Sequence, residues 1–515
     1  MTLFIKDIFR SKYLRNNIRN QLLHDKTIKV SLSFIEKEYE TLSKLNCTAF
    51  NIKIHLLIKS IDQYQLYINS PYRHLVNSIQ FCKFKVSEDQ LLESLDLLPL
   101  EITDLDISVV DLPVNSSFSN NSALKRLKIR LSKELKIESL PKDLNVLQLK
   151  SYNHRIPRLL FEMKQLKTLA ITITNLENTN FSDLYQPVNS DIRVELKLKL
   201  DTFINIDNFE NIKNMNLTNL YIFNIDEVKF KPGDLPTTIT TLKMSYYDVI
   251  EPGIIPNSVT DFELLNFCST PLQGSLPDSI TILRLLEYHG SIDIGVLPKS
   301  LTHLESLFFN QPLKVGSLPN SLKHLALDCF NQPILPGLLP NSLTHIGLKS
   351  INQELKGILP ISCQQLDISG SKFPLTMDVL PFNLTKLTIN QKSIEYINLP
   401  NSITDLIVYG YDESISLDSF NSNLKKLELF STLKALQKPL PESIQLLELN
   451  GIHLTSVSNQ VIPKSLEKLI INNTRFDLAS IQHTSVKTLE LPIKVTNNLP
   501  KSLINLIIDN TFESF

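Results

Sequence analysis

The most regular feature of the chain is a short apolar pattern that recurs about every 21 residues. In one copy, apolar side chains stand at the first, fourth, sixth and ninth positions, which are Leu322, Leu325, Leu327 and Phe330. The alternation in Leu-x-Leu has the period of a β-strand, with both leucines on one face. One such strand cannot bury this face alone, whereas stacked copies bury it in a continuous core. The pattern therefore predicts a repeat solenoid whose short parallel strands lie side by side.

A glycine and a proline mark the return from each strand to the next. Seven glycines lie three residues before a proline, at steps of 20 or 21 residues: Gly233, Gly253, Gly274, Gly295, Gly316, Gly337 and Gly357. Glycine suits a backbone with positive φ or a close approach between coils. A serine lies two residues after most of these prolines, where its hydroxyl can bond to backbone groups of the turn. The returns are therefore expected to consist of turns and short 3₁₀ segments, not full helices.

Weaker copies extend the array in both directions. Two copies without the proline keep the leucine pattern at 424–429 and 486–491, and earlier copies stand at 102–107 and 144–149. Strict alternation also predicts strands at 50–58 and 194–200. Divergent ends are expected, because terminal copies face water on one side. We divide the chain into a helical N-terminal segment at 1–45, divergent repeats at 46–230, regular repeats at 231–365, and less regular repeats with a C-terminal cap at 366–515.

Two successive copies contain Phe-Asn-Gln-Pro, at 309–312 and 330–333, and the next contains Ile-Asn-Gln-Glu at 351–354. With the Gly-x-Leu-Pro-x-Ser that follows, these residues resemble the FNIP repeat of social-amoeba proteins, a family similar to leucine-rich repeats. The resemblance is strong from about residue 230 to 365 and recognisable from about 95 to 510. It implies a curved solenoid with a parallel β-sheet on its concave face and irregular segments on its convex face. It also implies protein recognition and brings no catalytic residues.

Residues 1–45 lie outside the repeat pattern. Apolar residues recur there at the spacing of an amphipathic helix, with basic residues between them: Ile5, Phe9, Leu14, Ile18 and Leu22. The string at 9–15 resembles the start of repeat proteins of this family, some of which carry an F-box-like segment. Such a segment would bind a Skp1-like adaptor of a ubiquitin ligase. The alternatives are a helical cap that shields the first strand and a short helix at a membrane surface.

Composition and charge narrow the class of function. The 52 lysines and arginines against 53 acidic residues give a net charge of −1, without the basic excess that favours nucleic acid or anionic lipid. The five scattered cysteines form no C-x-x-C pair, which argues against a disulfide framework or zinc site and favours a cytoplasmic, reducing location. No run of 18 apolar residues predicts a membrane span. The main phosphate-binding, zinc-protease and nucleophile motifs are also absent, so we predict a protein that is not an enzyme and needs no cofactor.

Counted from the first apolar residue of a copy, the second, third and fifth positions face the concave side and carry the candidate partner-binding residues. The third position is histidine in three successive copies (His303, His324 and His345), and Glu305 and Asp261 lie on the same face. Stacked strands place these imidazoles roughly 5 Å apart, and mutual repulsion is expected to lower the pKa of at least one. The row can serve to bind a metal ion or respond to pH, or it simply reflects duplication of a copy. We predict that these five residues mark the centre of a protein-binding face.

Further concave positions carry charges of both signs, which favours a protein partner over a phosphate backbone. They are Lys386, Asp405, Lys425, Lys426, Glu428, Glu448, Glu467, Lys468 and Glu490. This set contains no aromatic residue, which argues against base stacking and nucleic acid. The sequence therefore predicts a protein-interaction scaffold, with an F-box-like substrate receptor of a ubiquitin ligase as the alternative.

Overall fold

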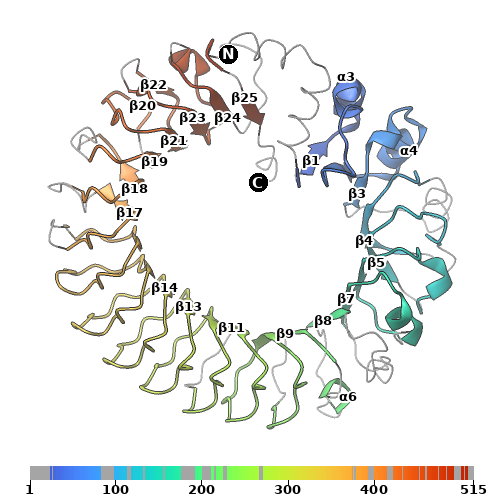
Figure 1. Ribbon diagram of the computed structural model, residues 1–515, viewed down its shortest axis with the longest axis horizontal. Helices are drawn as coiled ribbons and strands as arrows, with labels where there is room; N and C mark the ends of the chain where they lie inside the picture. Colours follow the sequence, from blue (N-terminus) through green and yellow to red (C-terminus); the bar gives the residue numbers. More distant parts are fainter. Residues whose placement is uncertain are drawn as a thin grey trace. The chain divides into compact units, whose positions relative to one another are not determined.

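The chain falls into two compact units, residues 1–245 and 246–515. Both are stacks of parallel β-strands joined by return segments (Figure 1). The computed structural model describes residues 24–508 except for 26, 83–97, 113–116, 132–133, 155–156, 175–191, 200–209, 214–215, 224–228, 266–270, 374, 376–378, 392–398, 414–420, 432, 452, 459–460, 474, 483, 492–499 and 504.

In the first unit the described strands pair in chain order, each parallel to the next. They are β1 (Thr27–Val30), β2 (Lys53–Ile58), β3 (Ser78–Phe81), β4 (Asp104–Leu112), β5 (Arg126–Leu131), β6 (Val146–Lys150), β7 (Thr168–Ile173), β8 (Arg193–Lys199), β9 (Asn219–Phe223) and β10 (Thr241–Ser245). The returns contain helices α3 (Leu32–Leu42), α4 (Ile61–Asn69) and α6 (Glu210–Lys213), and 3₁₀ helices η1 (Arg73–Leu75), η2 (Ile137–Ser139) and η3 (Arg158–Glu162).

In the second unit, too, the described strands of the ladder pair in chain order, each parallel to the next. Its ladder consists of β11 (Asp261–Leu265), β12 (Ile282–Leu285), β13 (His303–Ser306), β14 (His324–Leu327), β15 (His345–Gly347), β16 (Gln365–Ile368), β17 (Lys386–Asn390), β18 (Asp405–Tyr411), β19 (Lys426–Ser431), β21 (Leu446–Asn450), β23 (Lys468–Ile471), β24 (Thr488–Leu491) and β25 (Asn505–Ile508). Two short strands on the returns, β20 (Ala435–Leu436) and β22 (Ser456–Val457), pair with each other. The other returns are mostly turns, with a 3₁₀ helix at η8 (Leu478–Ile481). The sequence prediction of a repeat solenoid similar to leucine-rich repeats is confirmed.

Alternation along each strand separates the core from the concave face. In β14, Leu325 and Leu327 are each 1% exposed, whereas the alternating His324 and Ala326 are partly exposed. The parallel register places Leu325 beside Leu304 of β13 and Ile346 of β15, so each leucine packs against its equivalents. Burying one such side chain is worth about 1.5–3 kcal/mol. In each unit the strands line the inner side and the returns lie outside them (Figure 1).

Aromatic side chains stack beneath the strands in the regular repeats. Tyr288, Phe309 and Phe330, at the ninth position of three successive copies, are each at most 1% exposed. Neighbouring ring centroids are 6.0 Å apart, with interplanar angles of 4° and 3°. The phenylalanine of the Phe-Asn-Gln motif therefore forms part of a continuous internal stack.

The asparagine of the same motif joins successive coils. The side-chain oxygen of Asn310 accepts a hydrogen bond from the backbone N–H of Asn331 at 2.8 Å, and that of Asn331 accepts from Asn352 at 3.0 Å. The oxygen of Asn352 continues the series by accepting from the backbone N–H of Lys372 at 3.1 Å. Each side chain thus satisfies a turn amide of the next coil, which would otherwise lack a protein partner.

The glycines and serines of the returns have separate roles. All seven repeated glycines have positive φ, between 68° and 90°. A Cβ added at Gly316 or Gly337 would meet nothing within 4 Å, so the backbone conformation and not a close approach requires glycine there. The sequence analysis expects the serine hydroxyls to bond to backbone groups of the turn, but the bonds of two of them reach the preceding copy. Ser321 and Ser342 instead donate to the first-position carbonyls of the preceding copy, Leu301 and Leu322, at 2.7 and 2.6 Å.

The beginning of the ladder differs from the sequence prediction. The first coil is expected after residue 45, but β1 already pairs with β2, so among the described residues the ladder starts at Thr27. Helix α3 follows, with Ser31 as its N-cap, and buries Ile35 and Leu42. The return after β2 is the helix α4, where the repeat pattern predicts turns. Residues 1–23, with most of the predicted amphipathic helix, lie outside the described residues.

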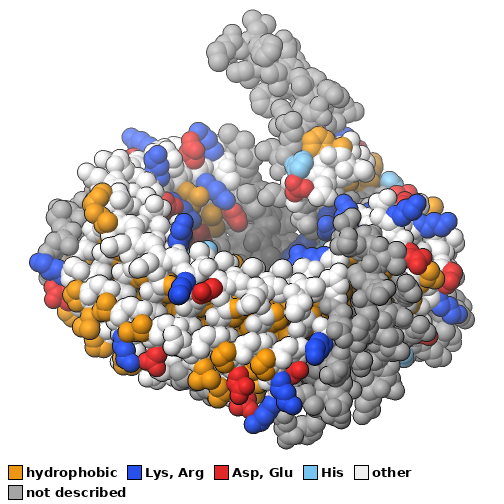
Figure 2. Space-filling model, turned by 60° about the horizontal axis from the view of Figure 1, so that its bottom comes forward, with side chains coloured by type: hydrophobic (Ala, Val, Ile, Leu, Met, Phe, Trp, Pro, Cys, Tyr) orange, Lys and Arg blue, Asp and Glu red, His pale blue; other side chains and the backbone are white. Residues whose placement is uncertain are grey.

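The side of the molecule drawn in Figure 2 shows no dominant charge among the described residues. On the side turned toward the viewer in Figure 2, basic and acidic side chains are interspersed with apolar ones. Exposed apolar residues of the returns include Leu272, Ile294, Val315 and Leu335. In the described part of the chain, no helix has the length and apolar character needed to cross a membrane.

Candidate functional site

The three predicted histidines stand side by side at the start of three neighbouring strands. His303, His324 and His345 are register partners across β13, β14 and β15. Their ring centroids are 5.4 and 5.6 Å apart, and each pair of rings is tilted by 21°. The spacing expected from the sequence is confirmed. We call these three residues the histidine row.

Threonines orient the two outer members of the histidine row. The hydroxyl of Thr302 lies 2.8 Å from Nδ1 of His303, and that of Thr344 lies 2.9 Å from Nδ1 of His345. Each hydroxyl also donates its single proton to a carbonyl of the preceding coil. It therefore accepts a hydrogen bond from Nδ1–H, because one hydroxyl proton cannot serve two acceptors. This arrangement leaves Nε2 of both rings as an acceptor for a partner.

An arginine joins the other predicted residues to the row. Arg284 of β12 lies 2.7 Å from a carboxylate oxygen of Asp261 and 3.4 Å from one of Glu305. Glu305 in turn lies 3.8 Å from Nε2 of His324. The structure thus brings all five predicted residues into one polar network. Arg284 was not among the predicted residues. The sequence could have indicated it, because it stands at the fifth position of its copy, between the copies that carry Asp261 and Glu305.

The surroundings of His324 and His345 favour the neutral form of their imidazoles. Burial lowers the pKa of His324 most, and the neighbouring histidines lower it further, whereas Glu305 opposes the shift. The pKa of His345 is also lowered, again mainly by burial, with smaller effects from His303 and Lys386. The expected direction is confirmed, but burial and not mutual repulsion is the main cause.

A depression opens in the concave face beside the histidine row. The fifth position of the copy is Glu305 in β13, and in the next three strands it is Ala326, Gly347 and Asp367. The two small residues leave a cavity of about 220 Å³. Its lining is His324, Ala326, Asp328, His345, Ile346, Gly347, Lys349, Gln365, Leu366, Asp367, Lys386 and Thr388. Lys349 and Asp328 form an ion pair of 2.8 Å at its edge. The depression therefore has an apolar floor and a charged rim.

The geometry offers little support for the metal alternative. Among the residues that the structure describes, no group of three or more histidines, cysteines, aspartates and glutamates is arranged to hold a metal ion. Neighbouring rings of the histidine row are nearly parallel and more than 5 Å apart. Zinc–nitrogen bonds of about 2.0–2.1 Å require nitrogens that converge on one point.

The concave face also carries aromatic residues, outside the set of charged positions that the sequence analysis named. Tyr409 and Phe430 stack there with centroids 4.2 Å apart, and Tyr221 and Phe223 lie on the same face of β9. They occupy the fifth and seventh positions of their copies, because the alternation of the strands continues to the seventh position there. The mixture of charges on the remaining concave positions is confirmed by ion pairs such as Lys468–Glu490, at 2.9 Å.

Comparison with known proteins agrees with this architecture. Residues 270–305 and 309–350 match the model of the FNIP repeat. These two stretches are FNIP repeats. Among solved structures, CroV588, described as a novel circular leucine-rich-repeat protein, is 24% identical with a TM-score of 0.51, over 87% of this chain and 68% of that one. This likeness shows the leucine-rich-repeat-like fold.

Two further solved structures are similar to this chain with lower TM-scores. YopM from Yersinia enterocolitica WA-314 is 17% identical with a TM-score of 0.37, over 87% of this chain and 100% of that one. The mouse RP105/MD-1 complex is 13% identical with a TM-score of 0.46, over 86% of this chain and 87% of that one. No curated protein matches the chain.

The lowered histidine pKa values predict a pH-dependent stability. Both folded pKa values lie below the ordinary value of 6.5, so below that pH the unfolded chain binds more protons than the folded one. The free energy of unfolding should therefore fall as the pH is lowered from neutral through this range. Urea midpoints across the range measure the slope. Replacing all three histidines of the row with glutamine should reduce this slope. Part of the slope should remain, because the pKa of His55 is also lowered in the folded chain. An unchanged slope in the triple variant would contradict the prediction.

Proposed function

We propose that this protein is an interaction scaffold that binds a protein partner through the concave face of its second unit. The observation that carries the proposal is the depression at Ala326 and Gly347, bordered by the histidine row. Solenoids similar to leucine-rich repeats are typically binding scaffolds, and the network of Asp261, Arg284 and Glu305 supports a preformed polar surface beside the depression. No enzymatic activity is included in this proposal.

Binding would combine shape with polar contacts. A projecting side chain of the partner would enter the depression and exclude water from its apolar floor, which is where interfaces concentrate their binding energy. The imidazoles of His324 and His345 offer ring faces and hydrogen-bonding nitrogens at one side. Because the strands and the ion pair of Lys349 with Asp328 fix this surface in advance, little conformational entropy is lost on binding.

Filling the depression should abolish capture of the partner. Gly347 has room for a side chain, because an added Cβ would contact Ala326 at an ordinary 3.6 Å. We expect Gly347→Leu, and replacement of the histidine row by alanine, to lose the same set of proteins in quantitative proximity labelling. As a matched control, Thr168→Leu adds the same side chain to the concave face of the first unit and should keep that set. Retention of every partner by both site variants would refute the proposal.

The alternative is an F-box-like substrate receptor in which residues 1–45 bind a Skp1-like adaptor. The structure changes how this alternative is tested, because deletion of all 45 residues would also remove β1 and the buried Ile35 and Leu42 of α3. Deletion of residues 1–23 leaves both elements in place. Loss of a Skp1-like protein on this shorter deletion would favour the receptor, and its absence from the full chain would exclude it. A cytoplasmic location and the lack of a nucleic-acid partner stay predictions.

A further inference from the structure

The concave face of the first unit carries a line of mostly basic side chains. Consecutive strands from β5 to β10 place in one register row Arg130, Lys150, Thr172, Lys197, Tyr221 and Lys243. At about 4.8 Å per strand, these six positions extend over roughly 24 Å. We call this set the basic row. Its position distinguishes it from the histidine row, which belongs to the second unit.

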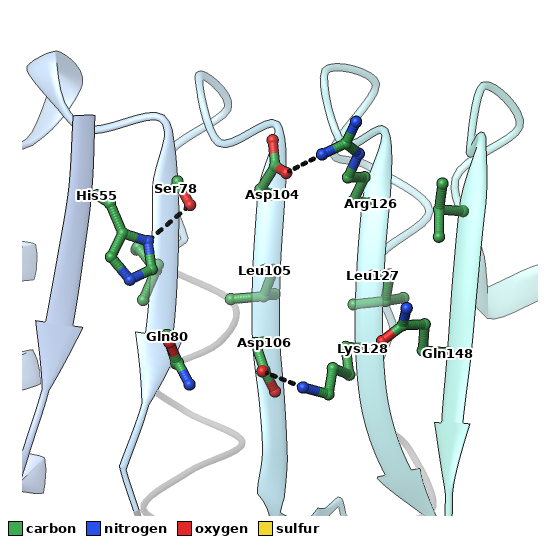
Figure 3. Close-up of a pocket in the computed structure, with 12 residues that line it drawn as sticks. His55, Ser78, Gln80, Asp104, Leu105, Asp106, Arg126, Leu127, Lys128 and Gln148 are labelled. Carbon is green, nitrogen blue, oxygen red and sulfur yellow. Dashed lines mark hydrogen bonds and ion pairs between the residues drawn. The ribbon is translucent and has the colours of Figure 1, made fainter. Parts of the chain in front are cut away.

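Carboxylates neutralise the neighbouring cations but not the centre of the basic row. In Figure 3, Arg126 and Lys128 of β5 point toward Asp104 and Asp106 of β4, with ion pairs of 3.6 and 2.7 Å. In the described part of the chain, Lys150 forms no such pair, and neither does Lys197. These two lysines therefore present charges that a partner can neutralise.

The surroundings of Lys150 favour an added anion. Its pKa is lowered, first by burial and then by the charge of Lys128, with a smaller effect from Lys197. The charge of Asp106 opposes this shift without reversing it. An anion bound between these ammonium groups would relieve their repulsion. The strand between Lys150 and Lys197 carries only small residues on this face, Thr168, Ala170 and Thr172, which leaves room for a bound group.

Aromatic rings contact two lysines of the row, Lys197 and Lys243. The ammonium group of Lys197 lies 5.1 Å from the ring centroid of Phe223, and that of Lys243 lies 5.8 Å from the centroid of Tyr221. Such cation–π contacts restrict the ammonium groups without neutralising them. They also cover one face of each ring, which reduces what is left for stacking a nucleic-acid base.

We propose that the basic row binds an extended acidic segment of a protein partner. A peptide is favoured over nucleic acid because Asp104, Asp106 and Glu195 share this face and would repel a continuous phosphodiester backbone. A peptide can place its carboxylates at the lysines and neutral residues elsewhere. The inference shares with the proposed function only the premise that the concave face binds proteins, and it does not depend on the histidine row.

Binding of a model acidic peptide tests the proposal. The full-length chain should bind a fluorescein-labelled oligoglutamate peptide in fluorescence anisotropy, and raising the salt concentration should weaken binding. We expect Lys150→Gln/Lys197→Gln to weaken it about tenfold, corresponding to a loss of about 1.4 kcal/mol. The control Lys314→Gln/Lys487→Gln removes two exposed lysines of the second unit and should bind as the wild type does. Circular dichroism verifies that all variants are folded.

The outcomes separate this inference from its alternatives. Lack of oligoglutamate binding, or equal binding by the Lys150/Lys197 variant, would overturn it. Tighter binding of a single-stranded oligodeoxynucleotide, lost in the same variant, would also overturn it and assign the row to nucleic acid. Replacement of the histidine row by glutamine should leave peptide binding unchanged, so failure of the proposed function and failure of this inference are distinguishable.

Discussion

Replacing Phe309 with alanine is expected to lower the free energy of unfolding by about 3–5 kcal/mol. Its ring is 0% exposed and stacks between Tyr288 and Phe330, so truncation leaves a cavity that both neighbouring rings border. In a solenoid, stability is approximately the sum of the stabilities of the copies and of their interfaces. The substitution therefore weakens two interfaces at once.

The adjacent residue provides the control for this prediction. Phe308 precedes Phe309 in the chain but is 46% exposed, and its ring lies 6.1 Å from that of His289. Phe308→Ala removes the same atoms from the surface and should change the stability by about 0.5 kcal/mol or less. Urea unfolding followed by circular dichroism measures both variants. Equal effects at the two positions would contradict the internal aromatic stack.

Gly370→Ala is expected to destabilise the protein by about 1–3 kcal/mol or more, although it adds only one methyl group. A Cβ at this position would lie 2.1 Å from the backbone carbonyl oxygen of Lys349 in the preceding coil. Because this neighbour is backbone, relief requires the two coils to move apart. The shift would also disturb the depression, whose lining includes Lys349.

A second glycine serves as the comparison for Gly370. At Gly347 an added Cβ would meet Ala326 at 3.6 Å, so Gly347→Ala should be tolerated. The two variants differ only in the contact that the new methyl group meets. Thermal melting and limited proteolysis should show a clear loss of stability in Gly370→Ala alone. Comparable melting of both variants would mean that the coils are not packed as closely as the structure has them.

Residues whose environment is set by the repeat itself were predictable from the sequence. The apolar positions of the copy at Leu322 define both the strand and its buried face, because the period-two alternation and the period of the copies act together. The same reasoning located strands without the proline signal, and β19 and β24 are found at those places. The spacing of the histidine row followed directly from strand stacking.

Features that depend on side-chain direction or on differences between copies were not predictable. The bond of Ser321 to Leu301 crosses to another coil, and the sequence shows only that serine lies near a turn. The link from Asp261 through Arg284 to Glu305 depends on the rotamers of three neighbouring strands. Burial, which dominates the pKa of His324, depends on the packed surroundings and not on the count of nearby histidines.

The links between coils also bear on how such a gene can change in length. Asn310 bonds to Asn331, and Ser342 bonds to Leu322, so each link joins sites that lie 20 or 21 residues apart. Unequal crossing-over that adds or deletes one complete period recreates every link with its new neighbour. An insertion of half a period inside a copy would leave both halves without their contacts. Length variants of this chain should therefore differ by whole periods, and shorter indels should be confined to the outer loops.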